Sequence, residues 1–444
     1  MKIIHIGIDD TDSTNMGCTT YIAAVAVEKL TSKGFKFIDY PNLIRLNPNI
    51  PWKTRGNGAV ALRLKTNNDN ETQEIFNTVY KLIIEYYDKN DPKPQPVIAM
   101  HTGNIPNILR EFSKKAINRI VSLDETLNIV NKLNINYKST EKGLRGLIGA
   151  VAAIGEPLDN SDYTYELLVY RPFTERSLKR NIDEKSILQM DEKTHPYTFS
   201  NIDKEEKRIL ITPHGPDPVI LGIRGENPEI LIKALKIIKI YDPIERWVIY
   251  RTNQGTDAHL IHTTLNKIEP YMSAIITGTI TSKPTITPGG HVFFKLNDTT
   301  GTINIAVYKE TGTLNKIARK LLPGDIISVA GGIKPGPIGL NLNAEKITII
   351  KPIERKIKIN PKCPKCNKNM SSIGKNQGYK CKKCGYTTKE QPKYINNTDP
   401  DLKPYTTHFQ TPKARRHLTK PPERYGKEKQ SFTYEKLYEP WHWP

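Results

Sequence analysis

Four of the five cysteines in this 444-residue chain form two Cys-x2-Cys pairs, Cys363 with Cys366 and Cys381 with Cys384. Fourteen residues separate the pairs, a spacing that lets four thiolates close around one tetrahedral zinc ion. Disulfides are the alternative, but five cysteines over the whole chain are too few for a disulfide scaffold. A segment as short as 358–390 cannot bury a core of its own, so a structural Zn²⁺ would supply its folding energy. We expect a zinc ribbon here.

The positive charge of the chain is concentrated around the same segment. The formal net charge is +20, and between Lys351 and Glu390 twelve Lys or Arg residues face only two Glu. This concentration indicates a polyanionic partner and favours nucleic acid over a membrane surface. We predict that Lys365, Lys382 and Lys383 contact RNA phosphates, with a solvated surface as the plain alternative. No apolar run has the length of a membrane span and the chain starts in a strand, so we expect a cytoplasmic protein with no membrane partner.

An acidic stretch, GIDDTDSTNMGCTTY at 7–21, connects an expected strand at 2–8 to an expected helix at 18–33. A helix start attracts phosphate, and Mg²⁺ shared between carboxylates and phosphates would remove the conflict with the acids. We therefore predict a nucleotide and Mg²⁺ site in this loop. The predicted catalytic residues are Asp9, Asp10, Asp12 and Thr19, and the predicted cofactor-binding residues are Ser13 and Thr20, with Thr14 beside them. The alternative is a turn whose Asp and Ser residues cap the helix.

The rest of the first part alternates between strands and helices. Expected strands near 38–46, 57–66 and 96–100 and a helix at 70–88 complete a β-α-β-β-α-β order, which is compatible with a split-βαβ sheet. A long helical stretch is expected at 105–133. In the segment TRGNG, Arg55 and Asn57 are predicted to bind the cofactor phosphates, and a simple turn is an equal alternative.

A second α+β unit is expected from the small-residue segment GLRGLIGAVAAIG onward. Strands are predicted at 163–170, 208–212, 218–225 and 246–250 with a helix at 228–240, whereas the polar stretch 172–206 is predicted to be rich in loops. The loop PHGPDP places His214 and Asp217 close to Arg224. These three residues are the predicted substrate contacts, in a pocket between the two units. A purely structural role is the alternative, above all for His214.

Five short strands with one helix between the third and the fourth follow in the segment 270–352, which is the order of an OB barrel. Such barrels bind oligonucleotides by stacking bases on aromatic side chains over a basic groove. We predict RNA contacts from Phe293, Phe294 and Lys295. Because side chains alternate along a strand, one of the two phenylalanines belongs to the core and only the other is available for stacking. The segment 391–444 is expected to be a basic, aromatic tail that binds RNA or packs back, with Trp441 and Trp443 as anchors.

The motifs taken together resemble a known family. The stretches GIDDTDSTNMGCTTY, IRLNPNIPWKTRGNG, GLRGLIGAVAAIG, ITPHGPDPVILGIRGE, RTNQGTDAH and GGHVFFKLNDTTG, followed by the four-cysteine ribbon, are similar in content and order to archaeal tRNA(Ile) 2-agmatinylcytidine synthetases over residues 1 to about 390. The resemblance implies a multidomain α+β protein. The implied units are a kinase-like catalytic domain at 1–140, a ferredoxin-like domain at 141–265, an OB fold at 270–352 and a zinc ribbon at 358–390, before the tail at 391–444.

The resemblance also implies an activity. Members of that family join agmatine to the 2-position of the wobble cytidine of one isoleucine tRNA, which changes its decoding from AUG to AUA, and they cleave ATP to AMP and phosphate. The family's loop threonine, which becomes phosphorylated, corresponds to Thr19 here. The expected cofactors are ATP, Mg²⁺ and structural Zn²⁺, and the expected partners are this isoleucine tRNA and agmatine. The alternatives are a non-catalytic OB-fold and zinc-ribbon protein that binds nucleic acid, and another ATP-using RNA-modifying enzyme.

Overall fold

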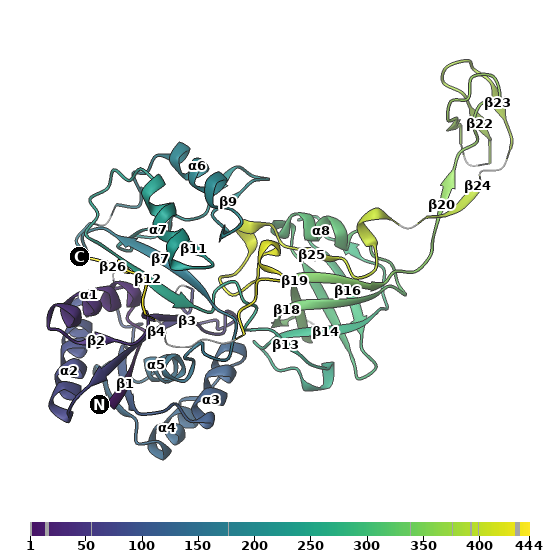
Figure 1. Ribbon diagram of the computed structural model, residues 1–444. Coiled ribbons are helices and arrows are strands. Elements are labelled where there is room, and N and C mark those ends of the chain that lie inside the picture. Colours follow the sequence, from purple (N-terminus) through teal and green to yellow (C-terminus); the bar gives the residue numbers. More distant parts are fainter. Residues whose placement is uncertain are drawn as a thin grey trace.

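A computed structural model describes residues 2–13, 17–54, 56–175, 177–337, 339–374, 376–390, 393–397, 399–430 and 436–444. Figure 1 shows a large α+β body on one side, a β-barrel beside it, and a small ribbon that projects beyond the barrel. The last segment of the chain returns from the ribbon over the barrel to the body.

The body is built on one sheet, which has eleven strands among the described residues. Its order is β6-β5-β1-β4-β3-β12-β7-β11-β8, with β2 added to β4 and β26 added to β12. The strands of the first half are β1 (Lys2–Asp9), β2 (Lys36–Phe37), β3 (Asn42–Arg45), β4 (Gly58–Thr66), β5 (Val97–Thr102) and β6 (Asn136–Ser139). Those of the second half are β7 (Thr164–Tyr170), β8 (Thr198–Phe199), β11 (Val219–Gly225), β12 (Arg246–Thr252) and β26 (His442–Trp443).

Strands β3 and β12 join the two halves of this sheet. They pair in parallel, with Arg251 opposite Asn42 and Thr252 opposite Leu43, whereas the other pairings of the sheet are antiparallel. The two α+β units expected from the sequence therefore share one continuous sheet. The acidic loop at the end of β1 and the loop before β11 consequently belong to the same body.

Helices cover both faces of the sheet. In the first half, α1 (Thr19–Ser32) and α2 (Asp69–Tyr86) lie on one face, and α3 (Asn107–Asn118), α4 (Leu123–Lys132) and α5 (Gly146–Gly155) lie on the other (Figure 1). The small residues of α5 let it approach β1 very closely, since a Cβ on Gly7 would lie 2.0 Å from the carbonyl oxygen of Ala150. In the second half, α6 (Glu184–Thr194) packs with α7 (Pro228–Ile237).

One expectation about helices is wrong and another is incomplete. The stretch 105–133 is not one helix, because α3 ends at Asn118 and Ser122 starts α4 by accepting a hydrogen bond from the backbone N–H of Glu125 at 3.1 Å. The stretch 172–206 contains α6, whose start is capped by Asp183 through the N–H of Lys185 at 3.0 Å. A short pairing of β9 (Ile202–Asp203) with β10 (Arg208–Ile209) follows it.

The second domain is a closed barrel with the OB-fold order predicted from the sequence. Its strands are β13 (Ile261–His262), β14 (Ser273–Ile280), β15 (Thr285–Ile286), β16 (Val292–Asn297), β17 (Thr302–Val307), β18 (Ile326–Gly336) and β19 (Gly339–Lys351), with α8 (Thr313–Ala318) between β17 and β18. Pairing of β14 with β16 and parallel pairing of β17 with β19 close the barrel. Phe294 is 2% exposed and belongs to its core.

The ribbon and the tail complete the chain. The paired strands β20 (Arg355–Ile359) and β24 (Lys393–Asn397) form a stem, and β21 (Ser371–Ser372), β22 (Tyr379–Lys380) and β23 (Thr387–Thr388) form the small sheet of the ribbon. In the tail, β25 (Thr407–Phe409) extends the barrel through β19 and β26 extends the body. Short 3-10 turns are η1 (Leu265–Lys267), η2 (Lys309–Thr311), η3 (Pro400–Leu402), η4 (Pro412–Ala414) and η5 (Pro422–Arg424).

The described part of the tail packs back onto the folded domains. Trp441 is 4% exposed and its ring contacts those of Phe37 and Tyr40, which confirms its predicted role as an anchor. Trp443 pairs with Trp247 through its backbone while its ring stays half exposed. Among the described residues, no helix is long and apolar enough to cross a bilayer.

Candidate active site and metal centre

A cavity of about 340 Å³ lies at the end of β1, where the two halves of the large sheet meet. Both halves and the tail contribute to its wall. Among the residues that line it are Asp9, Asp10, Asp12, Cys18, Thr19, Thr20, Arg45, Lys53, Asn57, Arg145, Glu166, Asp217, Arg224 and His417. The structure thus brings predicted catalytic and predicted substrate residues, which are about 200 positions apart in the sequence, into one cavity.

Asp9 is the last residue of β1 and faces helix α5. A Cβ on Gly149 would lie only 1.8 Å from Oδ2 of Asp9, so the glycine is what makes room for this carboxylate. Burial raises the pKa of Asp9 well above its ordinary value, and the neighbouring charge of Asp10 raises it further. Such crowding of negative charge is relieved when a cation binds between the carboxylates.

Asp10 is held by the protein itself. Its backbone has a left-handed φ of 58°. Its carboxylate accepts hydrogen bonds from Nε and Nη2 of Arg145 at 2.8 and 3.1 Å, and from the N–H of Gln95 at 3.1 Å. Burial nevertheless raises the pKa of Asp10 to about 6, because it outweighs the opposing effect of Arg145. Sequence reasoning did not identify Arg145 as part of this site.

Asp12 and Thr19 form the third element of the acidic loop. Oδ1 of Asp12 accepts hydrogen bonds from the backbone N–H of Thr19 at 2.7 Å and from its hydroxyl at 3.1 Å. The hydroxyl of Thr19 also lies 2.9 Å from that of Thr11. Asp12 therefore caps the first residue of α1 from seven positions upstream, as the alternative of a capping turn predicts in part. It also lines the cavity.

The other cofactor-binding residues predicted from the sequence differ in position. The hydroxyl of Thr20 lies 3.2 Å from Sγ of Cys18, and both residues line the cavity. Asn57 also lines it and donates to the carbonyl oxygen of Asn47 at 2.8 Å. Ser13 requires a correction, because its fully buried hydroxyl donates to Asp88 at 3.0 Å and it is not part of the cavity wall. Arg55 and Thr14 lie outside the described residues.

Another part of the wall carries a buried charge cluster around Glu166. Its carboxylate accepts a hydrogen bond from Nε of Arg224 at 3.2 Å and lies 3.7 Å from Nη2 of Arg45. Nη2 of Arg224 also contacts Nδ1 of His417, a residue of the tail, at 2.8 Å. The charge of Arg45, together with burial, holds the pKa of His417 well below its ordinary value. The imidazole is therefore neutral and accepts the hydrogen bond from Arg224.

Of the two loop residues expected beside Arg224, only one reaches the cavity. Asp217 lines it, and its Oδ1 accepts a hydrogen bond from the N–H of Val219 at 3.2 Å and lies 3.4 Å from Nη2 of Arg180. His214 is exposed, lies 2.7 Å from Arg208 through Nε2, and is not among the residues of the wall. Its prediction as a substrate contact needs correcting, because its ring contacts Arg208 and does not line the cavity.

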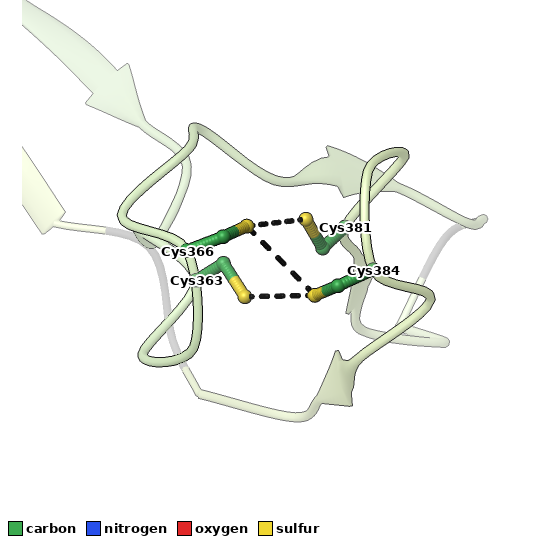
Figure 2. Close-up of side chains that lie close together, drawn as sticks. All are labelled: Cys363, Cys366, Cys381 and Cys384. Atoms are coloured by element: carbon green, nitrogen blue, oxygen red, sulfur yellow. Dashed lines mark hydrogen bonds between the residues drawn. The ribbon is translucent and has the colours of Figure 1, made fainter.

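The four cysteines of the ribbon converge on one point (Figure 2). Their sulfur atoms all lie within 4.8 Å of one another, with 3.4 Å between Cys363 and Cys384 and 3.3 Å between Cys366 and Cys381. Thiolates around a tetrahedral zinc ion are separated by about 3.8 Å, as follows from a Zn–S distance of about 2.3 Å. The donor set and its spacing fit a structural Zn²⁺ in which the protein supplies all four ligands.

The predicted RNA contacts are divided between surface and core. Lys295 is exposed on the barrel and Phe293 is partly exposed, whereas the core position of Phe294 excludes it from stacking on a base. On the ribbon, Lys365, Lys382 and Lys383 are exposed, and Nζ of Lys365 lies 5.6 Å from the ring centroid of Tyr386.

Comparison with known families covers most of the chain. The family "TiaS TCKD domain" matches residues 5–141 and "TiaS FLD domain" matches residues 144–259. "OB-fold nucleic acid binding domain" matches residues 274–350, and "TiaS C-terminal zinc ribbon domain" matches residues 360–397. These matches follow one another in the order of the sheet body, the barrel and the ribbon.

Individual relatives are similar over nearly their whole length. The tRNA(Ile) 2-agmatinylcytidine synthetase TiaS of Staphylothermus marinus is 42% identical, and the match covers 98% of this chain and 96% of the relative. A crystal structure of TiaS in complex with its isoleucine tRNA and ATP has a TM-score of 0.79 at 36% identity. A complex of TiaS with that tRNA, AMPCPP and agmatine has a TM-score of 0.78 at 34% identity. Each match covers 95% of this chain and 97% of the solved one.

Proposed function

We propose that this chain, which belongs to the TiaS family of tRNA(Ile) 2-agmatinylcytidine synthetases, is a ligase that joins agmatine to an isoleucine tRNA at the expense of ATP. The product is 2-agmatinylcytidine at the wobble position, which reads AUA instead of AUG, and AMP and phosphate are released. The observation that carries this proposal is the single cavity that joins the acidic loop of β1 to Asp217 and Arg224 of the second half.

The domain roles follow the order of the chain. The OB fold and the zinc ribbon are RNA-binding modules, with the ribbon folded around Zn²⁺. We assign residues 1–140 to a kinase-like catalytic domain that binds ATP and residues 141–265 to a ferredoxin-like domain, and we place the OB fold at 270–352, the ribbon at 358–390 and the tail at 391–444. The acidic loop at the end of β1 and the start of α1, which both line the cavity, support a nucleotide site there.

Asp9 and Asp12 are the proposed ligands of Mg²⁺. Burial, and after it the neighbouring charge of Asp10, raises the pKa of Asp9, and a divalent cation would offset both effects. Asp12 lines the same cavity while its Oδ1 holds Thr19. Asp10 is bound by Arg145 on both oxygens, so its proposed role is to position Arg145 at the cavity. When bound, Mg²⁺ supplies charge neutralisation for the phosphates of ATP.

Thr19 is the proposed phosphoryl acceptor, as the resemblance implies. Its hydroxyl is the first of helix α1 and donates to Asp12, which can take the proton when the oxygen forms a bond to phosphorus. The bond between that phosphorus and the nucleotide oxygen breaks in the same step. The backbone N–H groups at the start of α1 favour the negative charge that results.

Asp217 is the proposed partner of the agmatine guanidinium, because a carboxylate matches the planar donor pair of that group. Arg224, held between Glu166 and His417, is proposed to contact the substrate phosphoryl or the cytidine. The wobble base must leave its stack to reach this cavity, at a cost of a few kcal/mol. Contacts of Phe293, Lys295 and the ribbon lysines with the tRNA would offset that cost.

The test is an incorporation assay. Purified protein is incubated with the unmodified isoleucine tRNA, Mg²⁺, ATP and labelled agmatine, and the masses of the digested nucleosides are measured. We expect labelled 2-agmatinylcytidine with the native chain and at least about a hundredfold loss in the Asp9→Ala and Thr19→Ala variants. Asp69→Ala, which removes an exposed acid of α2, is the matched control and should behave as the native chain does.

The outcomes of this assay separate the activity from the site. Absence of label with every chain would leave only a nucleic-acid-binding protein. Label that persists in the Asp9→Ala and Thr19→Ala variants would reject the site assignment alone.

A further inference from the structure

A second cavity, of about 530 Å³, adjoins the reaction cavity and has a positively charged wall. Three parts of the molecule build it. Arg45 and Lys53 come from the end of β3 and the segment after it, Lys334 comes from barrel strand β18, and Arg416 comes from the tail. None of the residues described in this wall is acidic. The chemistry proposed above does not use this cavity.

Neutral groups hold two of these cations in place. Nζ of Lys334 donates to the carbonyl oxygen of Asn49 and lies 5.0 Å from the ring centroid of Tyr271. Nη1 of Arg416 donates to Oδ1 of the same Asn49. Asn49 is fully buried and is tied to the barrel by a 2.8 Å hydrogen bond from its Nδ2 to Oγ of Ser273. The contacts with Asn49 carry no negative charge, and Arg416 is held in addition by Glu345.

The acidic residues nearest to these cations are buried and do not line this cavity. Oε1 of Glu345 lies 3.4 Å from Nε of Arg416, and Oε2 of Glu166 lies 3.7 Å from Nη2 of Arg45. Burial, together with the charges of Arg416 and Lys53, lowers the pKa of Lys334 to about 8. Cations that repel one another across a cavity are stabilised when an anion binds between them.

The residues that line the cavity indicate which class of anion it binds. It shares Arg45, Lys53 and His417 with the wall of the reaction cavity, so the two cavities adjoin. Much of its remaining wall is apolar, made by Leu46, Pro48, Ile50 and Pro51. A phosphate group attached to a nucleoside matches both parts of the wall, because its negative charge can face the cations and its nucleoside can face the apolar residues. The nucleotide phosphates of ATP would arrive with a divalent cation, for which the described wall offers no carboxylate.

We propose that this cavity binds a backbone phosphate of the tRNA, next to the nucleotide whose base enters the reaction cavity. The inference rests on the proposed function for the identity of the RNA. It gives the tail a direct role, because Arg416 reaches the phosphate only when the tail is packed against both the barrel and the body. It also explains why the 47–49 turn is tied to β14, since this contact fixes the barrel cation relative to the body cations.

The test is the salt dependence of tRNA binding, measured by fluorescence titration without ATP and agmatine. Lys334→Gln and Lys53→Gln each remove one cation of the wall, and Lys81→Gln on the exposed face of α2 is the matched control. The slope of log affinity against log salt should become shallower by about 0.7 to 0.9 for each lost phosphate contact, and should stay unchanged in the control. Lys53 is exposed, so its variant tests the site even if Lys334→Gln alters the Asn49 contact. Slopes equal to that of the control in both variants would overturn the proposal.

A second arm separates the sources of phosphate. ATP affinity, measured by calorimetry without RNA, should be the same in the native chain and in Lys334→Gln, because Lys334 lines the second cavity and is not among the residues that line the reaction cavity. A several-fold loss of ATP affinity with an unchanged RNA slope would assign the cavity to the nucleotide and would overturn the proposal. Neither arm requires turnover. If the native chain incorporates no agmatine but the variants show the change in salt slope, the result would contradict the proposed function and support this site.

Discussion

Replacing Gly149 with alanine should reduce the rate of ligation on the order of a hundredfold in a chain that remains folded. The added Cβ would lie 1.8 Å from Oδ2 of Asp9, about 1.6 Å short of the 3.4 Å at which ordinary van der Waals contacts begin. It would also lie 3.0 Å from Cδ1 of Leu46, so the new methyl group cannot move away from Asp9 toward Leu46. The carboxylate of Asp9 is a movable side-chain end, so it is expected to rotate away from the position it occupies in the cavity.

The effects of Gly149→Ala on stability and on the rate of ligation should differ in size. Overpacking costs about 1–3 kcal/mol, and alanine regains about 1 kcal/mol over glycine in a helix, so the free energy of unfolding should fall by no more than about 2 kcal/mol. A displacement of about 1 Å at a group that positions reactants costs on the order of a hundredfold in rate. Activity should therefore fall much further than the fraction of folded protein.

The assays are single-turnover incorporation of labelled agmatine and urea unfolding of the same preparations. Gly155→Ala in the same helix is the matched control, because its Cβ would lie 2.4 Å from the backbone oxygen of Leu109, away from Asp9. Backbone cannot rotate aside, so this control should lose more stability than Gly149→Ala while its folded fraction keeps its rate. A Gly149→Ala chain with the native rate would refute the assignment of Asp9.

Three further outcomes are expected. Arg424→Met should lower the free energy of unfolding, measured in urea, by about 3–5 kcal/mol, because Asp162 and Glu226 would lose the fully buried guanidinium that pairs with them. An unchanged free energy of unfolding would contradict this expectation. Cys363→Ser should reduce the metal content from one zinc per chain to none by mass spectrometry, while the melting of the sheet body stays the same; full zinc content would reject the ribbon site. Calorimetric affinity for Mg²⁺ with ATP should fall as the pH is lowered through about 6. Burial raises the pKa of the proposed ligand Asp9 well above its ordinary value, so protons compete with the cation there, and the neighbouring Asp10, whose pKa burial raises to about 6, loses its negative charge; an affinity that is constant from about pH 7.5 to about pH 5 would exclude Asp9 as a ligand.

Features that depend on neighbours in the sequence were predictable. The zinc ribbon follows from the spacing of four cysteines, and the barrel follows from short strands with regular turns and one helix. The acidic loop was identifiable because Asp9, Asp10 and Asp12 lie within four positions. Helix α6 was missed because it is mostly polar and buries few apolar residues, among them Ile187 and Met190, so its periodicity is weak.

Features that depend on distant contacts were not predictable in the same way. Arg145 lies 135 positions after the Asp10 carboxylate that it binds, and Glu166 lies on a strand that reads as an ordinary buried segment. No local pattern distinguishes these charges from solvated ones. His214 was overestimated for the opposite reason, since a conspicuous loop motif does not determine which way its side chain points.

The tail shows why a run of charges is ambiguous in a sequence. Its basic residues suggested an RNA-binding arm, yet Arg424 is fully buried against two acids of the body, and Lys429 pairs with one of these acids, Glu226, at 2.8 Å. Burying charge is costly unless partners are in place, so these pairs hold the tail where it brings Arg416 and His417 to the cavities. The same segment therefore contains cations that are neutralised for structure and cations that remain available for an anion. Only their burial and partners separate the two groups.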